Sequence, residues 1–317
     1  MTLPLPSATE LAHWTLAAQH PLTRQWSSDD ESRLARLAED HMFDLRMATD
    51  LDFAAKGAAS APGHEPREML SRHVTVSSDL SALLSIRFEG LDPNKPFVDA
   101  SLLSRPLAES DLAELGTVAD HTFGSFGPRY VRMWSAAPTD ALPGTHQDRR
   151  FLAAPLSELV GAGRIGIPDE LSLTPTTDLA RWDDAAAAYA AVDADHPRHT
   201  EQAQIQDAED LRQSIDAGTL FDVIVNHTWA GWIGATIETS SSLGLPCYEV
   251  QEIILAPGYR GHGYGAHLAR LLASELPDRN RVLIGTIHAD NRGAQEAARR
   301  AGRHDVGGWL QLPLTRS

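Results

Sequence analysis

The sequence contains a single cysteine, Cys247, among its 317 residues. One thiol excludes an internal disulfide, and its place at the start of a strand-like run favours a small packed residue over a nucleophile. No apolar run approaches the roughly 18 residues that a membrane-spanning helix needs. The N-terminal stretch is interrupted by Pro4, Pro6 and Glu10 and has no signal-peptide core. We therefore expect a cytoplasmic protein without a membrane partner.

Positive charge is also scarce. Lys and Arg number 27 against 43 Asp and Glu, so the net charge is −16 and we expect no nucleic-acid partner. The exception is the segment from Gly258 to Arg303, where eight arginines oppose four acidic residues. That segment is +4, so the remainder is −16 − 4 = −20. A basic segment in an acidic chain suits a small anionic ligand.

The strongest motif lies between Glu249 and Leu272. Alternation predicts a strand that ends at Pro257, with Val250, Glu252 and Ile254 on one face. A glycine-dense turn follows, and leucines at helical spacing then predict a helix. Unpaired N–H groups at a helix N-terminus, approached by glycines without Cβ atoms, can bind phosphate or pyrophosphate. The predicted ligand loop comprises Arg260, Gly261, His262, Gly263, Tyr264, Gly265 and Ala266.

Two other interpretations of this region are weaker. Gly261, Gly263 and Ala266 also match a dinucleotide fingerprint, but the first glycine is too far from the strand end and too few residues follow for a doubly wound sheet. Histidine pairs at 196 and 199 and at 262 and 267 could suggest a metal. No carboxylate or cysteine completes either pair at ligand spacing, so we expect no metal.

The loop resembles that of a known family. Arg260, Gly263 and Gly265 match the Q/R-x-x-G-x-G/A signature of the GCN5-related N-acetyltransferases (GNAT), and the resemblance extends over about residues 171–314. It continues through a strand at 283–288 and through Asn291, which falls in the family's asparagine segment. The resemblance implies acetyl-CoA as the cofactor, with Asn291 and the backbone around Ile254 and Leu255 added to the loop as binding residues.

The resemblance also implies catalytic roles. Glu252 matches a glutamate that serves as general base in many members of the family, and Glu249 is the second choice because an unbroken strand would turn it to the other face. The family's general acid is a tyrosine, but Ala298 stands at its position. Either the thiolate leaves unaided, or Tyr264 or His288 replaces the tyrosine.

The predicted fold class is α/β (α+β), with two GNAT-like domains in tandem, each a mixed, mostly antiparallel twisted sheet flanked by helices on both faces. Residues 1–165 would hold a helical N-terminus and a degenerate copy, and residues 166–317 the acetyl-CoA-binding catalytic domain. The first half has the same order of elements, but Ser104 to Ala108, where the phosphate loop would be, lacks glycine. An unrelated α/β domain is the alternative for this half.

We therefore expect an acyltransferase that acetylates a primary amine of a small molecule, as a monomer or homodimer. The helices expected at 178–192 and 208–217 are acidic, which suits a cationic amine or simply a solvated surface. A non-catalytic acyl-CoA sensor is the alternative from another class. Length and layout are also similar to tandem enzymes of the mycothiol synthase type. The sequence does not identify the acceptor.

Overall fold

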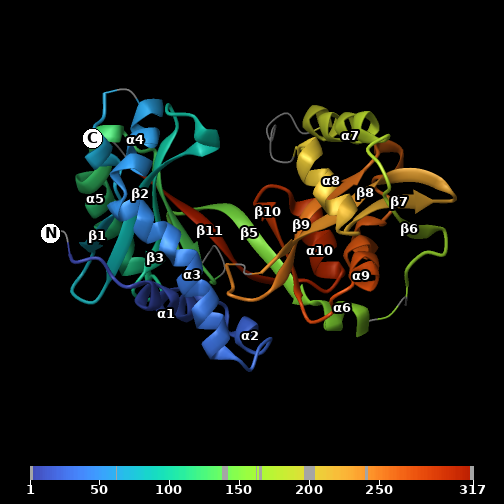
Figure 1. Cartoon of the computed structure of the whole chain (residues 1–317), viewed down its shortest axis with the longest axis horizontal. Coiled ribbons are helices and arrows are strands. Elements are labelled where there is room, and N and C mark those ends of the chain that lie inside the picture. The colour runs from blue at the N-terminus through green and yellow to red at the C-terminus, as the bar shows by residue number, and fades with distance from the viewer. Residues whose placement is uncertain are drawn as a thin grey trace. The chain divides into compact units, whose positions relative to one another are not determined.

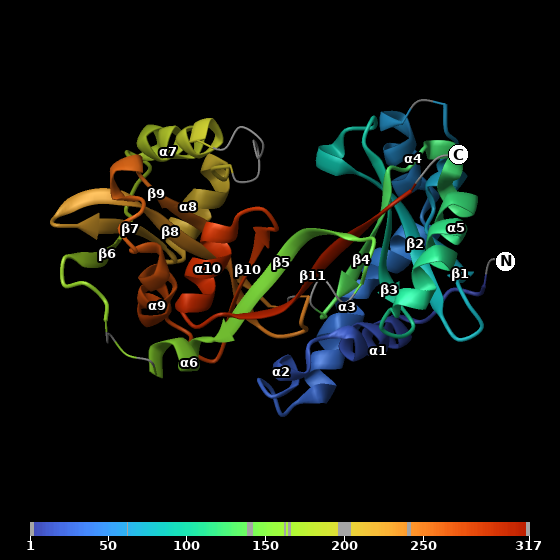
Figure 2. The same cartoon turned by 180° about the vertical axis from the view of Figure 1, so that it is seen from behind.

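The computed structural model describes residues 3–61, 63–137, 142–161, 163, 166–195, 204–239 and 242–314. Its strands have the hydrogen-bonded order β1-β2-β3-β4-β11-β5-β10-β9-β8-β7-β6. The chain divides into two units (Figures 1 and 2). Unit 1 comprises residues 1–150, 240–245 and 306–317, and unit 2 comprises residues 151–239 and 246–305. Within the described residues, no helix combines the length and apolar character needed to span a bilayer.

Unit 1 starts with helices and continues with a sheet. Its elements are α1 (Ala8–Ala18), α2 (Pro21–Arg24), α3 (Asp30–Thr49), α4 (Leu51–Ser60), β1 (Arg72–Thr75), β2 (Ser81–Phe88), β3 (Pro96–Leu103), α5 (Leu112–Phe123) and β4 (Tyr130–Ser135). Strands β1, β2 and β3 are antiparallel, whereas β4 is parallel to β3 after the crossover through α5. Apolar residues of α5 pack against these strands in one buried cluster.

Unit 2 has the same plan. Its elements are α6 (Leu156–Gly161), β6 (Leu171–Pro175), α7 (Trp182–Asp195), α8 (Ala208–Asp216), β7 (Leu220–Val225), β8 (Thr228–Glu238), β9 (Cys247–Leu255), α9 (Gly265–Glu275), β10 (Val282–His288) and α10 (Arg292–Arg300). Strands β6 to β9 are antiparallel, and β10 is parallel to β9 after the crossover through α9. The repeated order, strand-strand-helix-parallel strand, confirms the predicted α+β class and tandem plan.

Two strands belong partly to each unit. Strand β5 (His146–Pro155) is divided after residue 150, and β11 (His304–Pro313) after residue 305. Although β11 follows unit 2 in the chain, it pairs antiparallel with β4 of unit 1. The structure thus differs from the predicted boundary at residue 165, because residues 151–165 belong to unit 2 and residues 306–317 to unit 1. A single domain boundary in the sequence cannot describe units that are each made of more than one segment of the chain.

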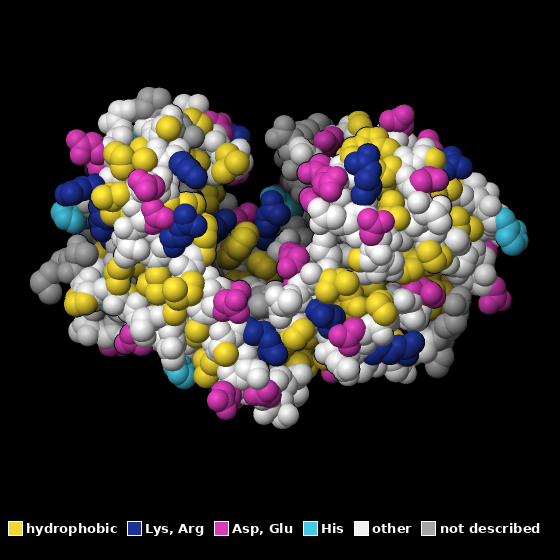
Figure 3. Space-filling view, viewed as in Figure 1, with side chains coloured by type: hydrophobic (Ala, Val, Ile, Leu, Met, Phe, Trp, Pro, Cys, Tyr) yellow, Lys and Arg dark blue, Asp and Glu magenta, His cyan; other side chains and the backbone are white. Residues whose placement is uncertain are grey.

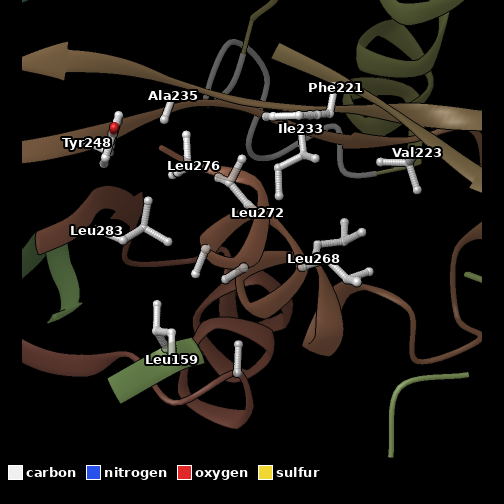
Figure 4. Packing of buried hydrophobic residues seen from close by; sticks show 14 of the residues in the cluster. Leu159, Phe221, Val223, Ile233, Ala235, Tyr248, Leu268, Leu272, Leu276 and Leu283 are labelled. Atoms are coloured by element: carbon white, nitrogen blue, oxygen red, sulfur yellow. The ribbon is translucent and has the colours of Figure 1, made fainter. Parts of the chain in front are cut away.

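The two faces of the unit 2 sheet are covered by different helices (Figure 1). Leu268, Leu272 and Leu276 of the α9 segment pack against Ile233 and Leu283 on one face (Figure 4). Burying one such side chain stabilises the fold by roughly 1.5–3 kcal/mol. On the other face, α7 and α8 form a second cluster that includes Trp232 and Ile254. The sheet therefore separates an α9/α10 side from an α7/α8 side.

Candidate functional site

Strand β9 carries the predicted base and contains a β-bulge. Val250 and Glu252 pair with adjacent residues of β8, so Gln251 is an additional residue. A bulge interrupts the alternation of side chains. Val250 consequently packs with the α9 cluster, whereas Glu252 bonds to α7 and Ile254 packs with the α7/α8 cluster. The predicted common face of Val250, Glu252 and Ile254 is therefore wrong for Val250.

Strands β9 and β10 stop pairing midway along their length. Their three paired positions end with Ile284 opposite Glu249, although β9 continues to Leu255 and β10 to His288. From this point the backbone edge of β9 is not hydrogen-bonded to β10. We call the region in which β9 and β10 are no longer paired the wedge. An extended ligand can add to the unpaired edge of β9 as a further strand would.

The two predicted backbone amides on β9 have different directions. The Ala256 amide donates to the Ala230 carbonyl at 2.8 Å, beyond the end of β8 pairing. Because N–H groups of a strand alternate between its two neighbours, the Ile254 amide faces β8 and the Leu255 amide faces the wedge. The Leu255 carbonyl points the same way, since it accepts a hydrogen bond from Arg260 Nε at 2.8 Å. Of the two amides, that of Leu255 is therefore the better placed to donate to a ligand in the wedge.

The glycine loop follows β9 and leads directly into α9. Gly261 and Gly263 have φ values of +77° and +84°, a region that favours glycine. No described residue accepts a hydrogen bond from the backbone amides of residues 261–264. A Cβ atom added at either glycine would meet no atom within 4 Å. The first residue of α9 is Gly265, and the preceding Tyr264 provides no side-chain cap. These open donors at a helix N-terminus suit a phosphate group.

Two donors of Arg260 bond to backbone carbonyls outside this loop. Its Nε bonds to the Leu255 carbonyl, and its Nη2 bonds to the Ala188 carbonyl of α7 at 2.5 Å. The guanidinium therefore ties the loop to the strand end and to α7. Direct contact between Arg260 and a ligand stays a prediction, and the structure gives this residue a positioning role.

The aromatic residues of the loop lie near its surface. The rings of His262 and Tyr264 are stacked, with centroids 5.9 Å apart. The Tyr264 hydroxyl donates to Glu170 at 3.4 Å, just before β6, and not to Glu252. Ala266 is in the first turn of α9, where its amide bonds to the Gly263 carbonyl at 3.2 Å. A catalytic role for Tyr264 gains no support from these contacts.

Glu252 is completely buried on the α7/α8 side. Its Oε2 accepts a hydrogen bond from the Tyr189 hydroxyl, and its Oε1 accepts one from the Gln206 amide at 2.8 Å. Burial raises the pKa of Glu252 above its ordinary value, and the two hydrogen bonds oppose that rise. A raised pKa is what a carboxylate needs to act as a base near neutral pH. Glu249, the second choice, is exposed.

Tyr189 is the residue that sequence reasoning missed. Burial and the neighbouring carboxylate raise the pKa of Tyr189, so it remains the hydrogen-bond donor of the pair. The available signal was an isolated tyrosine within the alanine-rich sequence of α7. Nothing local connected it with Glu252, which lies 63 positions later in the chain.

The two predicted site residues at the end of β10 and after it, His288 and Asn291, make hydrogen bonds to nearby backbone amides. Asn291 caps α10, because its Oδ1 accepts from the Ala294 amide at 3.1 Å. His288 Nδ1 accepts from the Asp290 amide at 3.2 Å in the preceding turn. Contact of Asn291 with a cofactor and of His288 with a leaving group stay predictions. Ala298, at the position of the family's tyrosine, is buried in α10.

Three arginines of the basic segment pair with acidic residues of the protein. Arg281 pairs with Asp278, and Arg299 and Arg300 also make ion pairs with acidic neighbours. On the face drawn in Figure 3, coloured side chains of both charge signs are interspersed. The charges of Arg281, Arg299 and Arg300 are therefore balanced by carboxylates of the protein. Of the two histidine pairs, residues 196 and 199 lie outside the part of the chain that the structure describes. Within the described part, no group of three His, Cys, Asp or Glu side chains could hold a metal ion.

The corresponding turn of unit 1 contains an internal anion. Asp111 Oδ2 accepts from the Ala108 amide at 2.8 Å, and both Asp111 oxygens accept from Arg105 at 2.7 and 2.9 Å. Arg105 also bonds to Asp79. A carboxylate of the protein itself therefore occupies the turn before α5, where the Ser104–Ala108 segment lacks glycine. That the first copy does not bind the cofactor there stays a prediction.

The family model for the acetyltransferase (GNAT) family matches residues 182–302, which include α7, the glycine loop and α10. Residues 182–302 are a GNAT acetyltransferase domain. This GNAT domain contains the bulge, the wedge and the open amides described above. A comparison with curated proteins gave no match.

Solved structures similar to the chain include several GNAT proteins. A GNAT acetyltransferase from Colwellia psychrerythraea is 13% identical, with 86% of this chain and 97% of that chain covered and a TM-score of 0.47. GCN5-related N-acetyltransferases from Kribbella flavida and Sphaerobacter thermophilus are 15% and 12% identical, with TM-scores of 0.41 and 0.42. They cover 84% and 86% of this chain and 96% and 94% of their own.

Proposed function

We propose that unit 2 is an acetyl-CoA-dependent N-acetyltransferase that acts on a primary amine of a small molecule. The observation that carries the proposal is the set of open amides at residues 261–264, placed at the end of β9 and the N-terminus of α9. Space around the positive-φ glycines leaves room for the pyrophosphate of coenzyme A. The unpaired edge of β9 offers hydrogen-bonding groups to its pantetheine arm.

When bound, acetyl-CoA supplies the thioester carbonyl that the amine attacks. The amine must be neutral, and Glu252 accepts the proton that the nitrogen loses. Tyr189 and the Gln206 amide hold the carboxylate, so Tyr189 is a positioning residue. The Leu255 amide faces the wedge and can donate to the thioester oxygen as negative charge develops on it.

A non-catalytic acyl-CoA sensor is the second candidate. Two observations favour it: Ala298 replaces the family's tyrosine, and both oxygens of Glu252 already accept hydrogen bonds. The two functions share the cofactor loop, so cofactor binding alone does not separate them.

Calorimetry with coenzyme A tests the loop, and incubation of acetyl-CoA with a panel of amines tests catalysis. We expect binding, followed by amine-dependent release of the free thiol and formation of an acetylated amine. Binding without thiol release for any amine would favour the sensor. A wild-type protein that does not bind coenzyme A would refute both functions.

A further inference from the structure

Arg303 is a buried cation in unit 2 with no carboxylate partner among the described residues. Its side chain is only 3% exposed. Nε and Nη2 donate to the Leu152 carbonyl at 3.0 and 2.6 Å, and Nη2 also donates to the Gly285 carbonyl at 3.3 Å. Among the described residues, no Asp or Glu pairs with it. Burial lowers the pKa of Arg303 to about 10, so the group remains charged at neutral pH.

An unpaired buried charge is costly, and proteins seldom retain one for packing alone. Three bonds to neutral carbonyls stabilise the guanidinium but do not neutralise it. Nη1 makes no hydrogen bond to any described residue, so part of the donor fork is unused. The guanidinium is thus a fixed positive charge with a donor that an anion could use.

Arg303 lies where β9 and β10 begin to separate. The last paired position joins Ile284 and Glu249, so Gly285 and Val250 are the next residues on each strand. A Cβ atom built on Gly285 would lie 2.6 Å from Arg303 Nη2 and 3.0 Å from Val250 Cβ. Since Val250 packs with the α9 cluster, the guanidinium lies on the α9/α10 side at the closed end of the wedge.

The same region lacks the family's tyrosine. Ala298 stands at that position, and the Arg303 amide bonds to the Ala298 carbonyl at 3.0 Å. Glu252 occupies the opposite face of the sheet, under α7. The closed end of the wedge therefore has a carboxylate on one face and a guanidinium on the other.

We infer that Arg303 stabilises the coenzyme A thiolate as it leaves, in place of a general acid; this inference rests on the proposed function. The amine nitrogen forms a bond to the carbonyl carbon, and its proton passes to Glu252. The carbon–sulfur bond breaks, and its electron pair goes to sulfur. The sulfur leaves as a thiolate beside the guanidinium, without needing a proton from a tyrosine, and is protonated later by water.

Titration of bound coenzyme A tests this without an acceptor. The ultraviolet absorbance of the thiolate reports the ionisation of the thiol in the complex with the full-length protein. An opposite charge within about 4–6 Å lowers a pKa by roughly 1–3 units, from about 8.5 for an ordinary thiol. We expect a shift of this size in the wild type, its loss in Arg303→Met, and its retention in Arg303→Lys.

Arg300→Met is the matched control, because Arg300 is an exposed α10 arginine paired with Glu296. It should leave the thiol titration unchanged, and acetyl-CoA, which has no free thiol, should bind the wild type and both Arg303 variants alike. An unshifted thiol in wild-type protein that binds coenzyme A would overturn the role of Arg303 while leaving the proposed function intact. The titration of the wild-type complex therefore tests the role of Arg303 even if Arg303→Met does not fold. Failure of the wild type to bind coenzyme A would overturn both.

Discussion

Replacing Tyr189 with phenylalanine removes one of the two hydrogen bonds that hold the Glu252 carboxylate. A hydrogen bond to a charged group contributes roughly 1.5–3 kcal/mol, and about 1.4 kcal/mol corresponds to one pKa unit. Tyr189 is 8% exposed and Glu252 is fully buried, so solvent screening does not reduce this value. The pKa of Glu252, already raised by burial, should rise by roughly one to two further units in Tyr189→Phe.

Carboxyl-carbon NMR of labelled glutamate measures this titration directly. Denaturant unfolding at a series of pH values provides the second measurement. Because the folded pKa of Glu252 is raised, its contribution to stability is complete below its unfolded pKa of about 4.3 and is lost as pH rises through the folded value. In Tyr189→Phe the loss should continue to higher pH.

Tyr248→Phe is the matched control for this experiment. Tyr248 is buried like Tyr189 and lies on β9, the strand of Glu252, but it belongs to the α9 cluster and its hydroxyl accepts from the Asp278 amide at 3.1 Å. Its removal should lower stability without moving the Glu252 titration. Equal Glu252 midpoints in wild type and Tyr189→Phe would refute the assigned role of the hydroxyl.

Three further predictions concern the base, the loop and the α10 cap. Glu252→Gln should lower turnover near neutral pH by more than about tenfold while acetyl-CoA binding in calorimetry is retained; equal turnover would remove Glu252 from the mechanism. Gly263→Val should abolish binding of coenzyme A, because valine rarely adopts a φ of +84° and would crowd the ligand; Gly258→Val, with no such φ and open space around it, should still bind. Asn291→Ala should lower the free energy of unfolding by about 0.5–2 kcal/mol through loss of the cap, and unchanged denaturation curves would contradict that role.

Much of the local structure was predictable because it depends on neighbours in the sequence. The strand ending at Leu255, the positive-φ glycines and the apolar face of α9 follow from spacing over a few residues. The helix cap at Asn291 is equally local. By contrast, the bulge at Gln251 is set by the pairing of β9 with β8, and it turned Val250 to the other face. No pattern within β9 alone reveals it.

The amino-acid sequence by itself determined the glycine loop and the helix start that follows it, since such a loop leaves open backbone donors whatever surrounds it. Only the tertiary structure decided the electrostatics of the site. Glu252 is buried and bonds to Tyr189 of α7, and Arg303 is buried and bonds to carbonyls of β5 and β10. A side chain's pKa depends on what the folded chain places around it, and those groups come from segments far away in the sequence.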